Sequence, residues 1–417
     1  MTARVSRSLP TIDEEIEIAA WHCRNILNTK FAELDKYLPG APKTAEGWFD
    51  LLSGIPSVRK SVRSLSSMRS SVPGGGAWPP GAAECYAVLQ SYRAALPRLA
   101  SLPLDEAVKR LYCATSKEVD CTNRRWSRYF DCSTEPFAEL AKIATLRRFT
   151  AGQLSFDITT LPRSWLLKIH PMALPRLIRE LAIGFGGFGP FAVPHLCHLR
   201  PNPLVILEAE SCRSFWRIAK CLELQPSVKG LMAASWFYSA EVGIAFPHLA
   251  WLRDFYVEQG AYLAEMEIAD ADAGFMIGSA KRRQLYEQGM FRPRQTLVLW
   301  RREAMLAWAE AHPEFGDDAL SPDSAAGESR RLTASAGLPI RIASAGCRSL
   351  KRNGRFGSLG AARLLNSRPK TYIFLSLIAP ATAAALIASL AVHPWAALPS
   401  FMAGLTVMWL VQYFFLQ

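Results

Sequence analysis

Residues 204–239 read LVILEAESCRSFWRIAKCLELQPSVKGLMAASWFYS, and this stretch decides the fold of the central part of the chain. Its two ends, 204–210 and 228–239, have the length and composition of strands, and 212–224 between them has apolar positions at helical spacing. Strand-like runs recur at 261–268 and 295–300, and helix-like runs at 248–258 and 279–288. Strands that alternate with helices predict an α/β or α+β domain over 151–315.

The N-terminal side of this domain is mainly helical by pattern. Thr11 followed by Glu14 predicts a capping box and a helix over 11–38. We therefore expect a helical segment over 1–55, a flexible Ser-, Gly- and Pro-rich linker over 56–83, and a helical region over 84–150.

One uncharged stretch, 181–199, reads LAIGFGGFGPFAVPHLCHL. Its glycines and prolines make a lipid-exposed helix unfavourable, so a loop or hydrophobic turn is predicted rather than a membrane span. Gly184, Gly186 and Gly189 match G-x-G-x-x-G, but a helix-like run precedes them, which favours a close backbone turn over dinucleotide binding. His195, Cys197 and His198 are metal-ligand types without a recognised spacing, so no metal is predicted.

The positive charge of the chain is concentrated in one segment. Lys and Arg number 48 against 36 Asp and Glu, a net charge of +12, yet no acidic residue follows Glu328 and ten of the positive charges do. Residues 1–328 are therefore left with +2. Nucleic-acid binding requires an organised basic face, so no nucleic-acid partner is expected for the body.

The basic segment precedes two uncharged runs, 371–392 and 400–416. A helix of the first length spans roughly 33 Å, enough for a bilayer core. We predict a basic flexible linker over 316–370 and a transmembrane helical hairpin over 371–417; the alternative is a hairpin buried in a globular fold. The positive-inside rule then places the protein in the inner (plasma) membrane, with the body and the C-terminus in the cytoplasm. Anionic lipid headgroups are the expected contacts of Arg348, Lys351, Arg352, Arg355, Arg363, Arg368 and Lys370.

Several cations occupy first turns of predicted helices, where they oppose the helix dipole unless an anion is nearby. These candidate anion-binding residues are Arg213, Lys281, Arg282 and Arg283. Glu208 and Glu210, which would share one face of the 204–210 strand, could pair with them. The other possible partner is a phosphate-bearing ligand or lipid headgroup, and structural pairing is favoured.

Four residues are candidates for acid–base chemistry, since carboxylate, phenol and imidazole groups can move protons. They are Glu208, Glu210, Tyr238 and His248. Tyr238 ends a predicted strand and His248 begins the next helix, and strand ends are where sites of α/β folds collect. For both residues, packing in an aromatic core is the favoured interpretation.

Two stretches carry a resemblance. SWFYSAEVGIAFPHLAWLR (235–253) and SAKRRQLYEQGMFRPRQTLVLW (279–300) resemble bacterial proteins without an assigned function, over about 150–310. The second stretch also looks like the closing segment of GNAT-type acyltransferases, which implies acyl-coenzyme A as the cofactor. The pyrophosphate loop of that family, R/Q-x-x-G-x-G/A, has no match, because 211–216 reads SCRSFW. No catalytic residue is carried over from the family.

Two functions follow as hypotheses. The first is a membrane-anchored acyltransferase-like enzyme that uses an anionic, coenzyme A-type ligand. The second is a non-catalytic, membrane-tethered binding or scaffold module whose protein partner the sequence does not identify.

Overall fold

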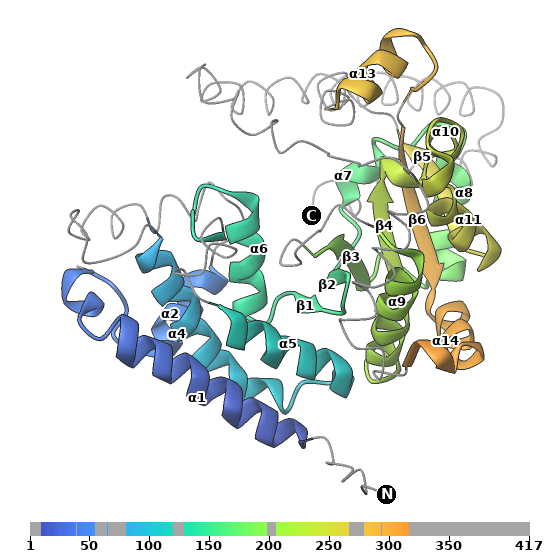
Figure 1. Cartoon of the computed structure of the whole chain (residues 1–417). Helices are drawn as coiled ribbons and strands as arrows, with labels where there is room; N and C mark the ends of the chain where they lie inside the picture. The colour runs from blue at the N-terminus through green and yellow to red at the C-terminus, as the bar shows by residue number, and fades with distance from the viewer. Residues whose placement is uncertain are drawn as a thin grey trace, which may run out of the picture. The chain divides into compact units, whose positions relative to one another are not determined.

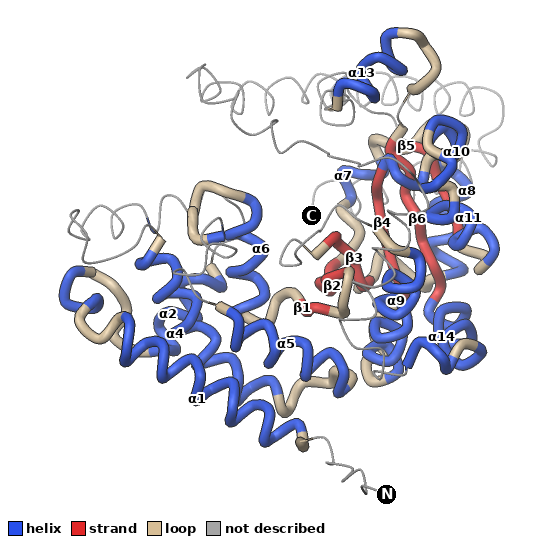
Figure 2. The backbone as a smooth tube through the Cα atoms, in the orientation of Figure 1, coloured by secondary structure: helices blue, strands red, loops and turns tan. Residues whose placement is uncertain are grey.

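The computed structural model describes residues 10–38, 40–54, 65, 81–119, 129–197, 206–266, 279–292 and 294–316. In this part of the chain, helices come first and then surround a six-stranded mixed sheet, so the fold is of the α+β class (Figure 1 and Figure 2). The predicted membrane hairpin and nearly all of the basic linker lie outside the described residues. Among the helices that are described, none combines the length and the apolar character needed to cross a bilayer.

The first helix, α1 (Ile12–Lys30), begins at the predicted capping box. The Thr11 amide donates to the Glu14 carboxylate at 2.7 Å, and the Glu14 amide donates to the Thr11 hydroxyl at 3.3 Å. The helix is shorter than predicted. The chain leaves it at Phe31, whose buried ring packs edge-on against Tyr86, and a separate turn, η1 (Leu34–Tyr37), follows.

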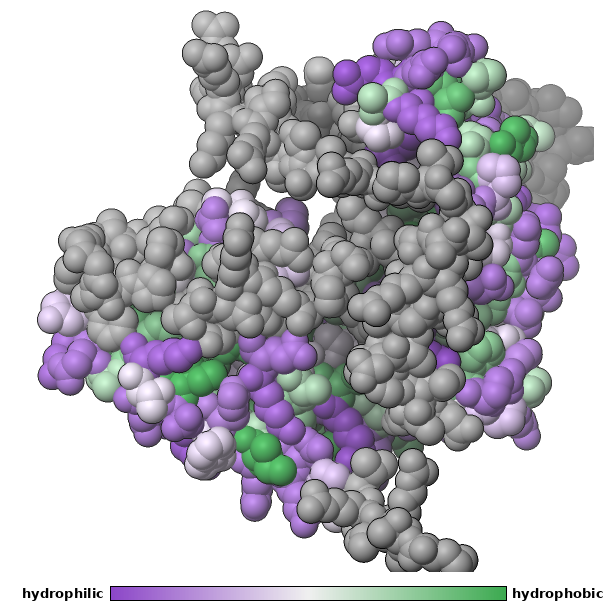
Figure 3. All heavy atoms as spheres, viewed as in Figure 1, coloured by the Kyte–Doolittle hydropathy of each residue, from purple (hydrophilic) through white to green (hydrophobic). Residues whose placement is uncertain are grey.

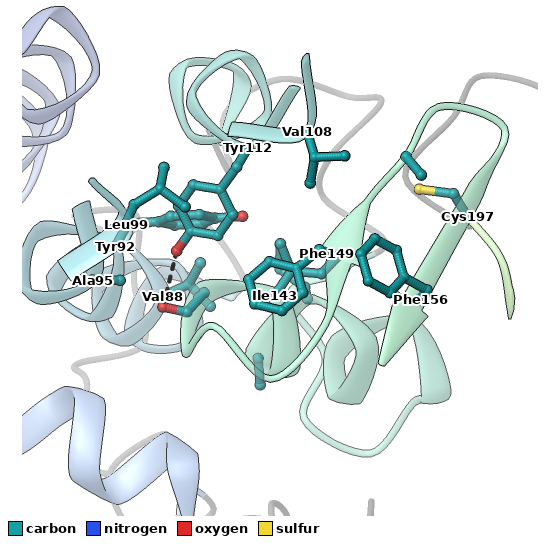
Figure 4. Close-up of a cluster of buried hydrophobic side chains, with 14 of the residues drawn as sticks. Val88, Tyr92, Ala95, Leu99, Val108, Tyr112, Ile143, Phe149, Phe156 and Cys197 are labelled. Carbon is teal, nitrogen blue, oxygen red and sulfur yellow. Dashed lines mark hydrogen bonds between the residues drawn. The ribbon is translucent and has the colours of Figure 1, made fainter. Parts of the chain in front are cut away.

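The other N-terminal helices are α2 (Ala45–Ser53), α4 (Ala82–Leu99), α5 (Glu106–Glu118) and α6 (Glu135–Ala144). Their apolar faces form one core that continues into the sheet. Figure 4 shows this continuity: the buried side chains run from Tyr92 of α4 and Tyr112 of α5 to Phe149 of β1 and then to Phe156 of β2. The two tyrosine rings meet edge-on at 5.2 Å, a geometry that aromatic pairs favour. The helical region and the sheet therefore share buried side chains.

The sheet has the strand order β1-β2-β3-β4-β6-β5. Its strands are β1 (Phe149–Thr150), β2 (Leu154–Thr159), β3 (Phe191–Leu196), β4 (Gly230–Ser235), β5 (Tyr262–Met266) and β6 (Gln295–Arg301). Four of the neighbouring pairs are antiparallel, and only β3 and β4 run parallel. The sheet is therefore two antiparallel groups that meet at one parallel junction.

Each face of the sheet is covered by a different set of helices. One face packs against α7 (Arg163–Leu166), α8 (Leu174–Arg179) and the π-helical turn η3 (Glu180–Gly184), where Leu177 and Leu181 meet Phe191, Met232 and Leu297. The other face packs against α9 (Glu208–Glu223), α11 (Trp251–Glu258) and α14 (Arg302–Ala311). Short elements complete the fold: η4 (Trp236–Tyr238), α10 (Ala240–Ala245), η5 (Pro247–Leu249), α13 (Ala280–Glu287) and η6 (Pro313–Gly316).

The predicted strand over 204–210 is wrong where the structure describes it. Residues 208–210 form the first turn of α9, so Glu208 and Glu210 do not share a strand face. Two acidic residues in a first turn are favoured by the helix dipole, and this effect outweighs the strand-like look of a short apolar run.

The predicted loop over 181–199 is also wrong in part, because 191–196 is β3. Strands β1 and β2 and helix α14 were not predicted at all. The alternation in LSFDIT (154–159) indicates β2, whereas Pro194 within β3 argues against a strand in any sequence pattern.

Gly230 at the start of β4 is expected to tolerate no side chain. Its φ is +145°, and a Cβ atom there would lie 2.1 Å from the Trp300 carbonyl oxygen. Gly230→Ala should lower the free energy of unfolding by about 2–3 kcal/mol. Gly260→Ala is the matched control, since its φ is +69° but no atom lies within 4 Å of the added Cβ; it should cost about 1 kcal/mol. Denaturant unfolding of both variants checks the difference, and equal losses would contradict the clash.

Candidate functional site at the carboxyl ends of β3 and β4

The parallel strands β3 and β4 pair at one position only, Ala192 with Leu231. The neighbouring antiparallel pairs β2–β3 and β4–β6 are each in register over six residue pairs. The pairing of β3 with β4 therefore ends near their amino ends, and their carboxyl ends continue without it. Carboxyl ends of parallel strands are the edge at which α/β sheets bind ligands.

Pro194 explains why the pairing stops. The Cys197 amide donates to the Gln153 carbonyl at 3.1 Å, so odd-numbered residues of β3 bond to β2. The backbone of Pro194 consequently faces β4, where the next rung needs an N–H that proline lacks. Within the described residues, no residue pair beyond Ala192 and Leu231 is in register across this junction.

His195, next to Pro194, is joined to an aspartate on the neighbouring strand. Its Nε2 lies 3.1 Å from Oδ1 of Asp157 in β2. His195 pairs in register with Ser155, so the Asp157 contact is a diagonal one on the same face of the sheet. The His195 side chain is 34% exposed and that of Asp157 is 18% exposed, so the imidazole is reachable while the carboxylate is largely covered.

Asp157 is held by a second, buried cation. The guanidinium of Arg148 donates to Asp157 Oδ2 at 2.8 Å, and its other nitrogen lies 3.9 Å from Glu139 Oε1. The Ser155 hydroxyl donates to the same Glu139 oxygen at 2.9 Å. Burial of the Asp157 carboxyl opposes its ionisation, but the hydrogen bonds and charges of His195 and then Arg148 outweigh burial and lower its pKa to about 2.

This network defines the proton positions on His195. An ionised carboxylate only accepts hydrogen bonds, so Nε2 of His195 carries the proton shared with Asp157. In the neutral imidazole, Nδ1 then has the free lone pair and can accept a proton. The arrangement of an imidazole oriented by a buried carboxylate is the one that general bases of acyl-transfer enzymes use.

The pKa of Asp157 predicts how acid affects stability. The carboxyl has an ordinary pKa of 3.8 and a folded-state pKa of about 2, so the native state binds its proton less readily than the unfolded chain does. The resulting stabilisation, about 2 kcal/mol, is present above the ordinary pKa and is lost as the pH falls from about 4 towards 2. The free energies of unfolding of the native chain and of Asp157→Asn should therefore approach each other as the pH falls across this window. A constant difference down to pH 2 would contradict the assignment.

An aromatic cluster follows the carboxyl end of β4. The rings of Trp236, Phe246 and Phe291 pack against one another, with Phe291 at 5.9 Å from Trp236 and 5.5 Å from Phe246. Two predicted anion-binding residues of α13 lie over these rings. The Arg282 guanidinium is 5.3 Å from the Trp236 centroid, and the Lys281 ammonium is 5.8 Å from that of Phe246.

Arg282 differs from its neighbours on α13 in being half-buried, whereas Lys281 and Arg283 are exposed. Burial lowers the pKa of the Arg282 guanidinium, and its Nε is buried without a hydrogen-bond partner among the described residues. The backbone amide of Arg282 is bonded to the Ser279 hydroxyl, the predicted helix cap. A half-buried cation with an unused donor is a group that an anion would stabilise.

The remaining predicted site residues lie elsewhere. Arg213 forms an ion pair with Glu210 on the same helix, as expected for structural pairing. Glu208 and His248 are exposed, and the ring of His248 contacts Phe246 edge-on. Tyr238 packs edge-on against Tyr256, and burial raises its pKa to about 12, which keeps the phenol protonated at neutral pH.

The glycine motif and the metal-ligand types can also be placed. Gly186 and Gly189 have φ values of +61° and +117° in the turn that leads into β3, which fits a close backbone turn. A helix precedes this turn and a strand follows it, the reverse of a dinucleotide-binding motif. His198 lies outside the described residues; within them, no group of three His, Cys, Asp or Glu side chains could hold a metal ion.

Comparison with known proteins adds little. No protein-family model matches the chain, and no curated protein matches it. A crystal structure of an acyltransferase in complex with decanoyl-CoA aligns with a TM-score of 0.35 and 13% sequence identity, over 69% of this chain and 99% of the other. A TM-score of this size carries no conclusion about function.

Proposed function

We propose that the chain is an acyltransferase-like enzyme that binds a coenzyme A thioester at the carboxyl ends of β3 and β4. The observation that carries the proposal is the single-rung junction of these strands beside the His195–Asp157 pair. We propose further that residues 371–416 anchor the chain in the membrane. The cations of the preceding 316–370 linker would then contact anionic lipid headgroups.

The strand junction suits the extended arm of coenzyme A. That arm contains amide groups, which can donate and accept hydrogen bonds as a strand does. Beyond the Ala192–Leu231 pair, the backbones of Leu196 in β3 and Ala234 in β4 lie where the two strands are no longer in register, so an amide-bearing ligand could hydrogen-bond between them.

His195 would act as the general base. Its Nδ1 takes the proton from an acceptor amine or hydroxyl as that group attacks the thioester carbonyl. The carbon–sulfur bond then breaks, the acyl group stays on the acceptor, and the coenzyme A thiolate leaves with the electron pair and is protonated. Asp157 remains ionised throughout and stabilises the imidazolium that forms.

The cations of α13 would hold the phosphates of the ligand. Arg282 has an unused donor, and Lys281 is exposed beside it. Arg213 is not needed for this role, because Glu210 already neutralises it. The absence of a glycine-rich pyrophosphate loop in 211–216 fits a ligand held by side chains.

A thermal-shift experiment tests the binding step. The full chain in mild detergent should melt about 5 °C or more higher with coenzyme A or an acyl-CoA at a hundred times its Kd. Arg282→Gln should reduce this shift, whereas Arg24→Gln, at an exposed arginine of α1, should not. If no member of an acyl-CoA series raises the melting temperature, the proposal fails and the binding or scaffold module becomes the better account.

A further inference from the structure

The segment 163–184 contains α7, α8 and η3. One side of it packs on the sheet, but other large apolar side chains of the segment are exposed. Four of them form what we term the apolar patch: Leu167, Met172, Ile178 and Ile183. Met172 is 84% exposed and Ile183 is 77% exposed, values at which a side chain contributes nothing to the core. In the view of Figure 3, hydrophobic side chains of the described residues lie among hydrophilic ones on the surface.

Two members of the patch come from adjoining helical turns, Ile178 from α8 and Ile183 from the π-helical turn η3. The Phe185 amide donates to the Glu180 carbonyl at 3.0 Å, a bond between residues five apart. A π-turn has more residues per turn than an α-helix, so residues five apart lie closer to one face. Ile178 and Ile183 are both exposed, while Leu177, Leu181 and Phe185 are buried against the sheet.

The same segment carries exposed cations. Lys168, Arg176 and Arg179 are exposed. None of the three forms an ion pair with another residue that the structure describes. The only acidic residue in 163–184 is Glu180, whose carboxylate is bonded to Arg301 at 2.5 Å. The surface is thus apolar and positively charged, with its one negative charge already neutralised.

We infer that the apolar patch and these cations dock the body on an anionic lipid bilayer, in the manner of an interfacial amphipathic helix. Such helices place apolar side chains into the headgroup boundary and Lys or Arg against anionic lipid. The chemistry of the segment matches that surface in both respects. The chain also carries two uncharged runs of membrane-spanning character at 371–392 and 400–416, so the inference rests on the proposed membrane anchoring.

Docking through the patch would fix the orientation of the body on the bilayer, which anchoring by the C-terminal hairpin alone does not. The C-terminal hairpin would hold the body near the bilayer, whereas the patch would fix which face meets it. That face is the one on which His195 and Asp157 lie, because odd-numbered residues of β3 and the helices α7 and α8 share it. The candidate site would then open towards the membrane surface.

Hydrogen exchange tests the docking. The full chain is reconstituted with vesicles of phosphatidylcholine, with or without phosphatidylglycerol, and compared with the chain in detergent. Exchange in 163–184 should slow on the order of tenfold in the anionic vesicles, since each cation near such a surface strengthens attraction about fivefold. Ile178→Ser with Ile183→Ser, and Arg176→Glu with Arg179→Glu, should each abolish this slowing.

Matched controls lie on α1. Ile18 and Ile178 are both 47% exposed, so Ile18→Ser is the control for the apolar change, and Arg24→Glu is the control for the charge change; both should leave the slowing intact. Vesicle-bound chain without slowing in 163–184 overturns the docking and leaves the anchoring standing. Chain that does not associate with vesicles overturns both. Slowing that appears equally in detergent and rises with protein concentration indicates a second copy of the chain on the patch, and it also overturns the inference.

Discussion

Arg148→Met is expected to lower the free energy of unfolding by about 3–5 kcal/mol, the cost of removing one partner from a buried ion pair. Arg148 is the cation between Asp157 and Glu139, and the side chains of Arg148 and Glu139 are almost fully buried. Methionine fills much of the same volume, so the loss reports the removal of the guanidinium from the Glu139 carboxylate and from Asp157, which keeps only its contact with His195. Denaturant unfolding of the full chain measures it.

A rescue variant separates charge from packing in this prediction. If the loss comes from unpaired carboxylates, adding Glu139→Gln and Asp157→Asn to Arg148→Met should restore a large part of the stability. Should the triple variant be no more stable than Arg148→Met alone, the loss would be one of packing, and the electrostatic account would have to be abandoned.

His195→Gln is expected to lower the rate of acyl transfer by about 10²–10⁴-fold, the usual contribution of a general base. Glutamine can still donate a hydrogen bond to Asp157, so the fold and the binding of acyl-CoA should change little. Release of the coenzyme A thiol measures the rate, and the melting temperature with bound acyl-CoA measures the binding.

The matched control for this variant is His248→Gln, since His248 is an exposed histidine of η5 on the same domain. It should leave the rate within about twofold of the native chain. A His195→Gln enzyme that keeps its full rate would remove His195 from the mechanism without affecting the proposed binding site.

Local signals predicted the elements that depend on local interactions. The capping box at Thr11 placed the start of α1, and β-branched or aromatic runs placed β4, β5 and β6 to within a few residues. The errors occurred where tertiary structure outweighs local preference. Residues 208–210 look like a strand and form a helix, and 191–196 contains a proline and forms a strand because its non-bonding position faces the junction with β4.

The candidate site was largely beyond the reach of sequence patterns. Asp157 and His195 are 38 positions apart, and their contact depends on the register of β2 with β3. Asp157, Arg148 and Glu139 formed no motif, and Arg148 joins the other two only after α6 has packed beside the sheet. Arg282 was predicted from its place in a first turn, but its position over Trp236 depends on the packing of α13 against the aromatic cluster.

The proline in β3 also affects how the sheet opens locally. Strands β3 and β4 are joined by one bridge, between Ala192 and Leu231. The sheet therefore consists of a β1–β2–β3 block and a β4–β6–β5 block, and within each block the strands are paired antiparallel. Local opening follows contiguous hydrogen-bonded units rather than whole sheets. The two blocks can therefore act as separate cooperative units, and a ligand that bridges them would couple their opening into a single event.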